Sequence, residues 1–286
     1  TGYNAPTFDN GSKRDRAMAD RLKVEITTGV AHVLLTRGDK MNALDSAMFE
    51  ALRETGIELA QTPEVRAVVL SGEGRAFCAG LDMGNFASMA DAGNSPDVTS
   101  GGKLAERTHG IANGPQAAAW VWREMPVPVI AAVHGVAFGG GFQVCLGADM
   151  RYASPDTRFS VMEIKWGLVP DMGGTRLMKD LARDDVIREL TYTGRMFSAE
   201  EALAYGFVTR VVDDPLALAL ETAAEIASRN PGAQRASKRL LNAAHQLTDA
   251  EGLLMESEEQ DGIIGAPNQI EAVMSELEKR PANYSD

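Results

Sequence analysis

The chain has 286 residues, a formal net charge of −12 and a composition that is 44% apolar and 24% charged. This composition is typical of a globular protein with a large core, and it excludes a disordered, collagen-like or coiled-coil chain. The acidic charge argues against nucleic acid or an anionic membrane as partner, and no apolar run reaches the roughly 20 residues of a membrane span. The two cysteines form no disulfide framework or zinc motif, so we expect a cytoplasmic protein without a metal.

The first half of the chain alternates between strand and helix patterns. Residues 1–20 are polar and predict a flexible tail, and residues 22–36 hold two β-branched runs around Thr28-Gly29, which predicts a hairpin. Asp45 and Ser46 precede apolar residues at helical spacing, so we expect a helix that begins there and stops at Pro63. Residues 65–70 and 127–133 are nearly continuous apolar runs, as in strands buried within a parallel sheet, and a third strand is expected at 148–153.

The second half divides into a long polar segment, more of the α/β core and a helical tail. Residues 84–114 are rich in Gly, Ser and Asn, which is typical of a ligand-covering or mobile segment, and a helix with Trp120 and Trp122 follows. After Asp213-Asp214-Pro215 the pattern is amphipathic and helical to the end. We therefore predict an α/β core over residues 21–212 and a helical oligomerisation domain over residues 213–286.

Three glycine-containing segments follow predicted strands: RAFCAGLD at 75–82, GVAFGGGFQ at 135–143 and EIKWGLVPDMGGT at 163–175. Ligands of α/β sheets collect at the carboxyl ends of strands, and glycine lets main-chain N–H groups approach a ligand closely. The triple glycine also opens a predicted helix, whose free N–H groups favour negative charge. Two such loops predict an oxyanion hole, while ordinary turns are the alternative.

The three segments do not match other common ligand-binding or catalytic motifs. The glycines are not followed by the Lys-Ser/Thr of a phosphate loop, and their spacing differs from that of a dinucleotide fingerprint. The chain also lacks a serine-hydrolase elbow. Cys78 has no histidine nearby in the sequence, so we expect a small buried apolar residue in preference to a nucleophile.

Together with Lys40-Met41-Asn42-Ala43-Leu44, these motifs resemble the crotonase superfamily of enoyl-CoA hydratases and isomerases. The resemblance implies a crotonase (ClpP-like) spiral fold of repeated ββα units with a C-terminal α-helical domain. It also implies a homo-oligomer, either a trimer or a dimer of trimers. The implied substrate is a coenzyme A thioester, which needs no further cofactor. Its carbonyl oxygen would bind the main-chain N–H groups of Leu81 and Gly140, and the implied binding residues around them are Ala79, Gly80, Asp82 and Gly139.

The acid and base groups depart from the hydratase pattern. In the hydratase pattern one glutamate follows the triple glycine by two positions and another opens the later segment. Here the first position holds Gln143 and the second holds Glu163. An amide cannot act as a general base near neutral pH, which disfavours hydration by two glutamates. Gln143 either lines the site, as a substrate-binding residue, or is a helix-capping or packing amide.

A second acid, Asp171, lies eight residues after Glu163, beyond a Gly-Leu-Val-Pro turn. This spacing resembles the dienoyl-CoA isomerase branch, in which an aspartate and a glutamate exchange protons with opposite ends of a conjugated system. The structural alternatives make Asp171 the cap of a helix beginning near Gly173 and pair Glu163 with an arginine such as Arg176. Because the spacing matches that branch, we predict Glu163 and Asp171 as catalytic residues.

The predicted function is acid/base chemistry on unsaturated acyl-CoA thioesters, with double-bond isomerisation preferred. The alternatives are a 2-enoyl-CoA hydratase that uses Glu163 alone and a thioester-binding protein with little catalysis. Lys40 and Lys279 are candidates for binding the phosphates of coenzyme A, although solvated surface charge is an equal explanation. The predicted partners are the thioester and further copies of the chain, without nucleic acid or membrane.

Overall fold

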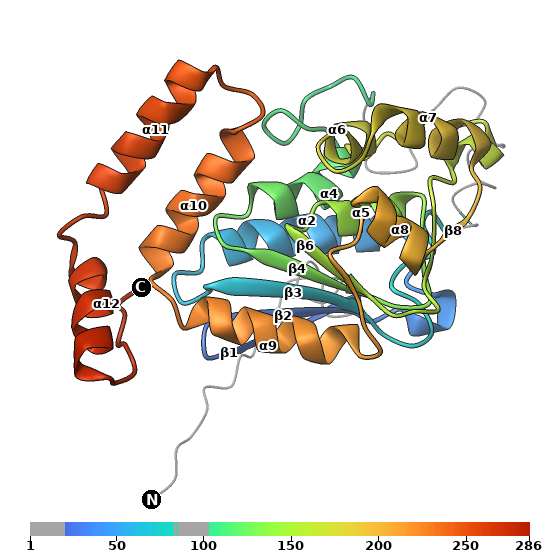
Figure 1. Cartoon of the computed structure of the whole chain (residues 1–286). Coiled ribbons are helices and arrows are strands. Elements are labelled where there is room, and N and C mark those ends of the chain that lie inside the picture. The colour runs from blue at the N-terminus through green and yellow to red at the C-terminus, as the bar shows by residue number, and fades with distance from the viewer. Residues whose placement is uncertain (1–20, 83, 85–102) are drawn as a thin grey trace, which may run out of the picture.

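The computed structural model describes residues 21–82, 84 and 103–286. The predicted tail at 1–20 and most of the predicted covering segment at 84–114 lie outside the described residues. The described residues form a six-stranded sheet with helices on both of its faces (Figure 1).

The large sheet has the strand order β1-β2-β3-β4-β6-β9. Strand β1 is antiparallel to β2, and every other neighbouring pair is parallel. The predicted hairpin is confirmed, since Thr28 and Gly29 both have a positive φ, as a two-residue turn between twisted strands requires. The predicted parallel strands are also confirmed. The bounds are β1 Leu22–Thr27, β2 Val30–Leu35, β3 Ala67–Gly72, β4 Val129–Val133, β6 Met150–Ala153 and β9 Arg210–Val211.

A second sheet of three short strands lies beside the first, in the order β5-β7-β8. Its strands are β5 Val136–Phe138, β7 Arg158–Ser160 and β8 Phe197–Ser198. Strands of two or three residues carry no measurable alternation, so the sequence did not predict them. The chain thus passes from a strand of the large sheet to one of the small sheet and then into a helix, as in β4, β5 and α5 Gly140–Leu146. This is the ββα unit that the resemblance implied.

Two layers of helices cover the large sheet (Figure 1). Helices α2 Ser46–Ala60 and α4 Gly114–Glu124 lie over one face and contribute to the main apolar core. Helix α2 begins where expected, because the Asp45 side chain accepts a hydrogen bond from the Met48 N–H at 2.8 Å. On the other face, α9 Pro215–Ala227 packs Ala219, Ala223 and Ala227 against the sheet in a second, smaller cluster.

The remaining helices lie at the two sides of the sheet. Near the small sheet are α6 Gly174–Lys179, α7 Asp184–Thr193 and α8 Ala199–Tyr205. The helical C-terminus is confirmed and continues as α10 Pro231–Ala243, α11 Asp249–Asp261 and α12 Pro267–Glu278. Because α9 covers the sheet, the helices that extend away from the core begin with α10 (Figure 1).

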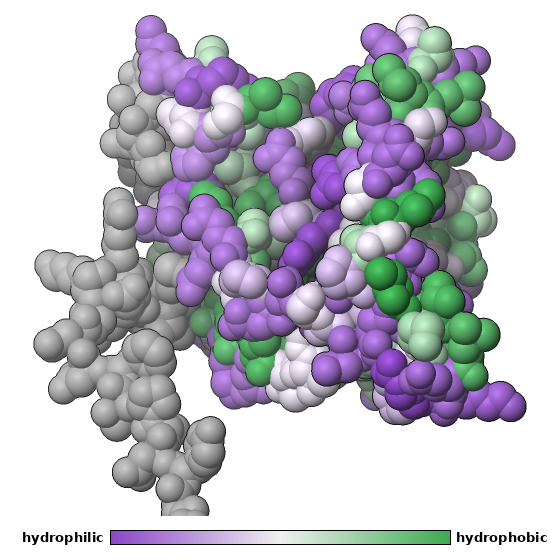
Figure 2. Space-filling model, turned by 90° about the vertical axis from the view of Figure 1, so that its left-hand side faces the viewer, coloured by the Kyte–Doolittle hydropathy of each residue, from purple (hydrophilic) through white to green (hydrophobic). Residues whose placement is uncertain are grey.

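Figure 2 shows the side of the molecule that carries these C-terminal helices, where apolar side chains form several patches between polar ones. Large apolar side chains exposed on α10–α12 include Leu241, Leu253, Leu254, Ile270 and Leu277. Within the described ranges, none of the helices combines the length and apolar character needed to cross a bilayer.

Candidate active site

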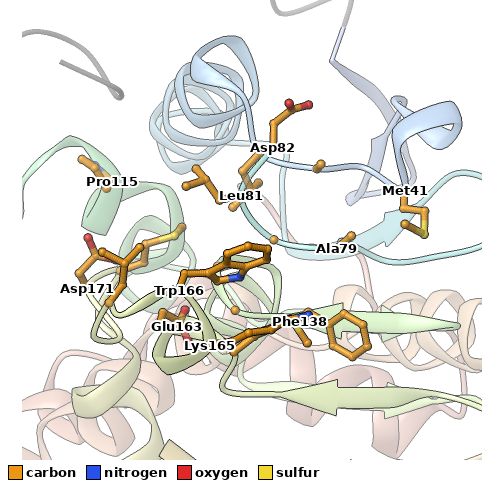
Figure 3. Close-up of a pocket in the computed structure, with 18 of the residues that line it drawn as sticks. Met41, Ala79, Leu81, Asp82, Pro115, Phe138, Glu163, Lys165, Trp166 and Asp171 are labelled. Atoms are coloured by element: carbon orange, nitrogen blue, oxygen red, sulfur yellow. The ribbon is translucent and has the colours of Figure 1, made fainter. Parts of the chain in front are cut away.

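A cavity of about 1450 Å³ opens at the carboxyl ends of the strands. Two 3-10 turns contribute to it, η1 Gly38–Lys40 and η2 Glu163–Trp166. In Figure 3, Leu81 and Ala79 lie along one wall, and Glu163, Trp166 and Asp171 lie along the facing wall. The structure thus brings nine of the predicted site residues to one cavity: Lys40, Ala79, Gly80, Leu81, Asp82, Gly139, Gly140, Glu163 and Asp171.

The loops that carry Leu81 and Gly140 are held side by side by their main chains. Cys78 and Ala137 form a parallel bridge, with hydrogen bonds from Cys78 N to Val136 O and from Phe138 N to Cys78 O, both 3.1 Å. Gly80 has a positive φ, and a Cβ there would lie 2.6 Å from the Phe138 carbonyl oxygen and 3.6 Å from the Gly140 nitrogen. Only glycine permits this approach of the two loops.

The N–H groups of Leu81 and Gly140 are free to bind a ligand. Neither donates a hydrogen bond to any acceptor among the described residues. Gly140 is the first residue of α5, so its N–H has no acceptor within the helix and lies at the positive end of the helix dipole. Helix α5 is fixed below the cavity by Phe142, whose ring contacts those of Phe159, Phe197 and Phe207 edge to face at 5.5–5.8 Å between centroids.

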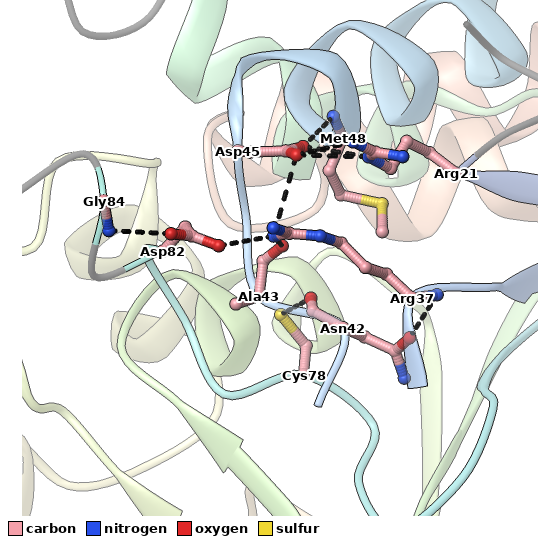
Figure 4. A network of polar contacts seen from close by, with 9 residues as sticks. All are labelled: Arg21, Arg37, Asn42, Ala43, Asp45, Met48, Cys78, Asp82 and Gly84. Atoms are coloured by element: carbon pink, nitrogen blue, oxygen red, sulfur yellow. Dashed lines mark hydrogen bonds and ion pairs between the residues drawn. The ribbon is translucent and has the colours of Figure 1, made fainter. Parts of the chain in front are cut away.

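An arginine that the sequence did not single out holds the Leu81 loop in place (Figure 4). Arg37 Nη1 donates to Asp82 Oδ2 at 2.6 Å and to the Ala43 carbonyl at 2.9 Å. Asp82 Oδ1 accepts the Gly84 N–H at 2.7 Å. The Gly84 N–H and Arg37 together lower the pKa of Asp82. Asp82, predicted to bind substrate, thus lines the cavity while its carboxylate is bonded within the protein.

Asn42 fixes the turn beneath the same loop. Its Nδ2 donates to the carbonyls of Glu73 at 3.0 Å and Ala76 at 2.8 Å, and its Oδ1 accepts the Arg37 N–H at 2.9 Å. The Cys78 thiol donates to the Asn42 carbonyl at 3.0 Å (Figure 4). Cys78 is fully buried, as expected, and burial raises the pKa of its thiol to about 12, which disfavours a role as nucleophile.

Glu163 opens η2 with a side chain that is almost fully buried, 9% exposed as a residue. Its Oε1 accepts a hydrogen bond of 2.6 Å from Gln143 Nε2, whereas Oε2 is buried without a partner among the described residues. Burial raises the pKa of Glu163, and the negative charge of Asp171 raises it further. The alternative pairing with Arg176 is wrong, because the partner of the carboxylate is Gln143.

Asp171 lies in the loop before α6. The structure contradicts its alternative role as a helix cap, because α6 is capped by Gly173 and no side chain donates or accepts a capping hydrogen bond there. The residue is open toward the cavity, yet protein atoms surround the carboxylate on its other sides and desolvate it, which raises its pKa. The carboxyls of Glu163 and Asp171 therefore both have a raised pKa, whereas that of Asp82 is lowered.

Three predicted binding residues occupy different positions. Lys40 is exposed at the rim of the cavity. Gln143 is 1% exposed and is not part of the cavity wall, because it lies behind Glu163. Lys279 ends α12 as an exposed residue, and the cavity residues of this chain do not include it.

Several apolar residues of the wall were not singled out from the sequence. They include Leu44, Phe138, Trp166 and Met172. Trp166 stands three residues after Glu163 in the 163–175 segment, so its place in that motif was the available signal. The others also lie in the quoted motifs, Leu44 in 40–44, Phe138 in 135–143 and Met172 in 163–175.

Comparison with known proteins supports the fold and the family that the sequence motifs resemble. The chain matches the family described as "Enoyl-CoA hydratase/isomerase" over residues 25–286. It therefore belongs to the enoyl-CoA hydratase/isomerase family and is an enzyme of the crotonase type.

Two relatives and one solved structure indicate the range of the similarity. The chain is 31% identical over 264 residues to the mitochondrial Delta(3,5)-Delta(2,4)-dienoyl-CoA isomerase of Mus musculus, covering 90% of this chain and 80% of that one. It is 30% identical over 270 residues to a probable enoyl-CoA hydratase of Mycobacterium bovis, covering 93% and 98%. The crystal structure of a putative enoyl-CoA hydratase from Streptomyces coelicolor superposes with a TM-score of 0.81 at 31% identity, covering 100% and 98%.

Proposed function

We propose that this chain isomerises double bonds in unsaturated acyl-CoA thioesters of the dienoyl type. The observation that carries the proposal is that two carboxyls with raised pKa, Glu163 and Asp171, line the same cavity as the free N–H groups of Leu81 and Gly140. Two such carboxyls can act at the two ends of a conjugated system, one removing a proton from carbon and the other supplying one.

The proposed reaction uses each group once. The thioester carbonyl oxygen accepts hydrogen bonds from Leu81 N–H and Gly140 N–H, which stabilise the negative charge that develops on it. One carboxylate removes a proton from carbon, and the electron pair spreads over the conjugated chain to the carbonyl oxygen. The other carboxyl gives a proton to the far end of that system. One proton is lost and one gained, so the product has the mass of the substrate.

The amide of Gln143, at the position where the hydratase pattern has a glutamate, favours isomerisation over hydration by two bases. Its Oε1 already accepts two main-chain N–H groups, from Met172 at 2.9 Å and Gly174 at 2.8 Å. The amide has no basic site for a water proton. Similarity to a dienoyl-CoA isomerase is consistent with the proposal, and similarity to a probable hydratase makes hydration by Glu163 alone the alternative to test.

The test is an incubation of the purified protein with 2-enoyl, 3-enoyl and 3,5-dienoyl thioesters, followed by mass spectrometry of the products. Isomerisation predicts a rearranged product of unchanged mass, most rapidly from the 3,5-dienoyl thioester. Addition of one water to the 2-enoyl thioester, with the dienoyl compound unchanged, would contradict the proposal.

We also propose that the chain assembles into a trimer or a dimer of trimers. The support is the set of apolar side chains on α10–α12 that the other described residues of the chain leave exposed. Light scattering at micromolar concentration should give three or six times the chain mass, and the mass of a monomer or a dimer would contradict this.

A further inference from the structure

Gln143 lies between the two parts of the chain that carry the carboxylates. It comes from α5, directly after Phe142, and its side chain reaches Glu163 on one side and the loop after Asp171 on the other. The three hydrogen bonds of its amide are 2.6, 2.8 and 2.9 Å long. A buried amide with this many contacts has a fixed position.

The direction of each bond follows from chemistry. Main-chain N–H groups can only donate, so the amide atom that faces Met172 N and Gly174 N must be the oxygen Oε1. The NH₂ group therefore faces Glu163 Oε1, and an NH₂ group can only donate. A flipped amide would oppose donors to donors at Met172 and Gly174 and an oxygen to the carboxylate, and it would lose all three bonds.

The bond to Glu163 has two consequences for that carboxyl. A donor on Oε1 favours the charged form, which opposes the effect of burial. It also occupies Oε1, so that Oε2, without a partner among the described residues, is the oxygen left for a proton. Glycine at position 174 is required here, because a Cβ there would lie 2.5 Å from Gln143 Oε1.

We propose that Gln143 is a positioning residue that keeps Glu163 in its charged form, with Oε2 as the proton acceptor, and ties it to the loop that carries Asp171. Its use in a two-acid reaction rests on the proposed isomerase function. The hold on Glu163 applies to any reaction in which Glu163 is the base. The other titratable group that acts on Glu163 from the surrounding described elements is Asp171.

Two substitutions distinguish the hydrogen bond that Gln143 donates to Glu163 from those that it accepts from Met172 and Gly174. Gln143→Glu keeps an oxygen for the Met172 and Gly174 N–H groups but places a second carboxyl 2.6 Å from Glu163, so the pair must share a proton. Gln143→Leu removes all three hydrogen bonds. Gln61→Glu, at an exposed position after α2, adds the same charge away from the cavity and serves as the control.

The first measurement is the titration of ¹³C-labelled glutamate carboxyls by NMR, with Glu163 assigned by the signal that is lost in Glu163→Gln. In Gln143→Leu we expect the midpoint of Glu163 to rise by about one to two pH units, which corresponds to one hydrogen bond to a charged group. In Gln143→Glu we expect a two-step titration shared by the pair, and in Gln61→Glu no change. A Glu163 midpoint equal to that of the wild type in both Gln143 variants would overturn the proposal.

The second measurement is the pH profile of kcat for whichever thioester the wild type converts. For Gln143→Glu we expect the rise of kcat with pH to move up to the upper step of the pair, because below that step the shared proton keeps Glu163 partly neutral. A purely structural role would lower kcat equally at every pH and would contradict the proposal. A hydrated product of the wild type would contradict the proposed isomerase function. An unchanged pH profile and an unchanged Glu163 titration in the Gln143 variants would instead contradict the role of Gln143, so the two outcomes are distinguishable.

Discussion

The two walls of the cavity present different parts of the chain. The first wall, formed by residues 79–82 and 138–140, offers the main-chain N–H groups of Leu81 and Gly140, whereas the second wall offers the side chains of Glu163 and Asp171. The position of an N–H group depends on the path of the backbone, which the paired loops and α5 determine. The identity of a side chain can change while the backbone stays in place. In the proposed reaction, the first wall therefore binds the thioester carbonyl and the second transfers the protons.

The main-chain wall is tested most strongly at Gly140. Gly140→Pro removes the N–H at the first position of α5, where proline suits the helix. Loss of one oxyanion donor should lower kcat by about 10²- to 10³-fold. Gly140→Ala is the matched control, since its Cβ also meets the Leu44 and Met172 side chains but the N–H remains. Equal activity of the two variants would show that the N–H takes no part in catalysis.

The support of the same wall is tested at Asn42, which is fully buried and bonded to three main-chain groups. Asn42→Gly keeps the positive φ without strain but leaves these groups unpaired. The free energy of unfolding should fall by about 2–3 kcal/mol in chemical denaturation. A change within experimental error would mean that water or neighbouring groups replace the asparagine.

The side-chain wall should behave in the opposite way, with a gain in stability when its charge is removed. Burial raises the pKa of Glu163 in the folded state, so its contribution to stability is greatest below the ordinary value of 4.5 and is lost as pH rises through the folded pKa. Glu163→Gln removes that loss at neutral pH. Calorimetry should show a higher Tm for the variant at pH 7, by about 2–4 °C for each kcal/mol of stability gained. The Tm values of the variant and the wild type should converge as the pH falls toward 4. A lower Tm of the variant at pH 7 would contradict the account.

The sequence predicted the first wall better than the second, for a physical reason. Glycines at strand ends are local signals of the backbone path, so Gly80, Leu81 and Gly140 were located in advance. The link from Arg37 to Asp82 spans 45 residues of sequence and has no local pattern.

For the second wall the sequence predicted the carboxylates but not their surroundings. The spacing of Glu163 and Asp171 left open whether they bind arginine, cap a helix or face a cavity. Only the fold shows that Gln143 is the partner of Glu163 and that Gly173 caps α6. The small sheet was missed for a related reason, because strands such as Phe197–Ser198 are too short to show a period.

In the proposed reaction both carboxylates exchange protons with the substrate, and Asp171→Asn tests this most directly. The variant keeps the shape of the side chain and removes the proton acceptor, and Asp39→Asn at the cavity rim is the control for loss of charge. We predict that kcat for 3,5-dienoyl thioester isomerisation falls by about 10²-fold or more, while the dissociation constant of the thioester is nearly unchanged. Wild-type kcat of Asp171→Asn on every thioester tested, alongside an inactive Glu163→Gln, would contradict the two-acid account and leave a hydratase that uses Glu163 alone.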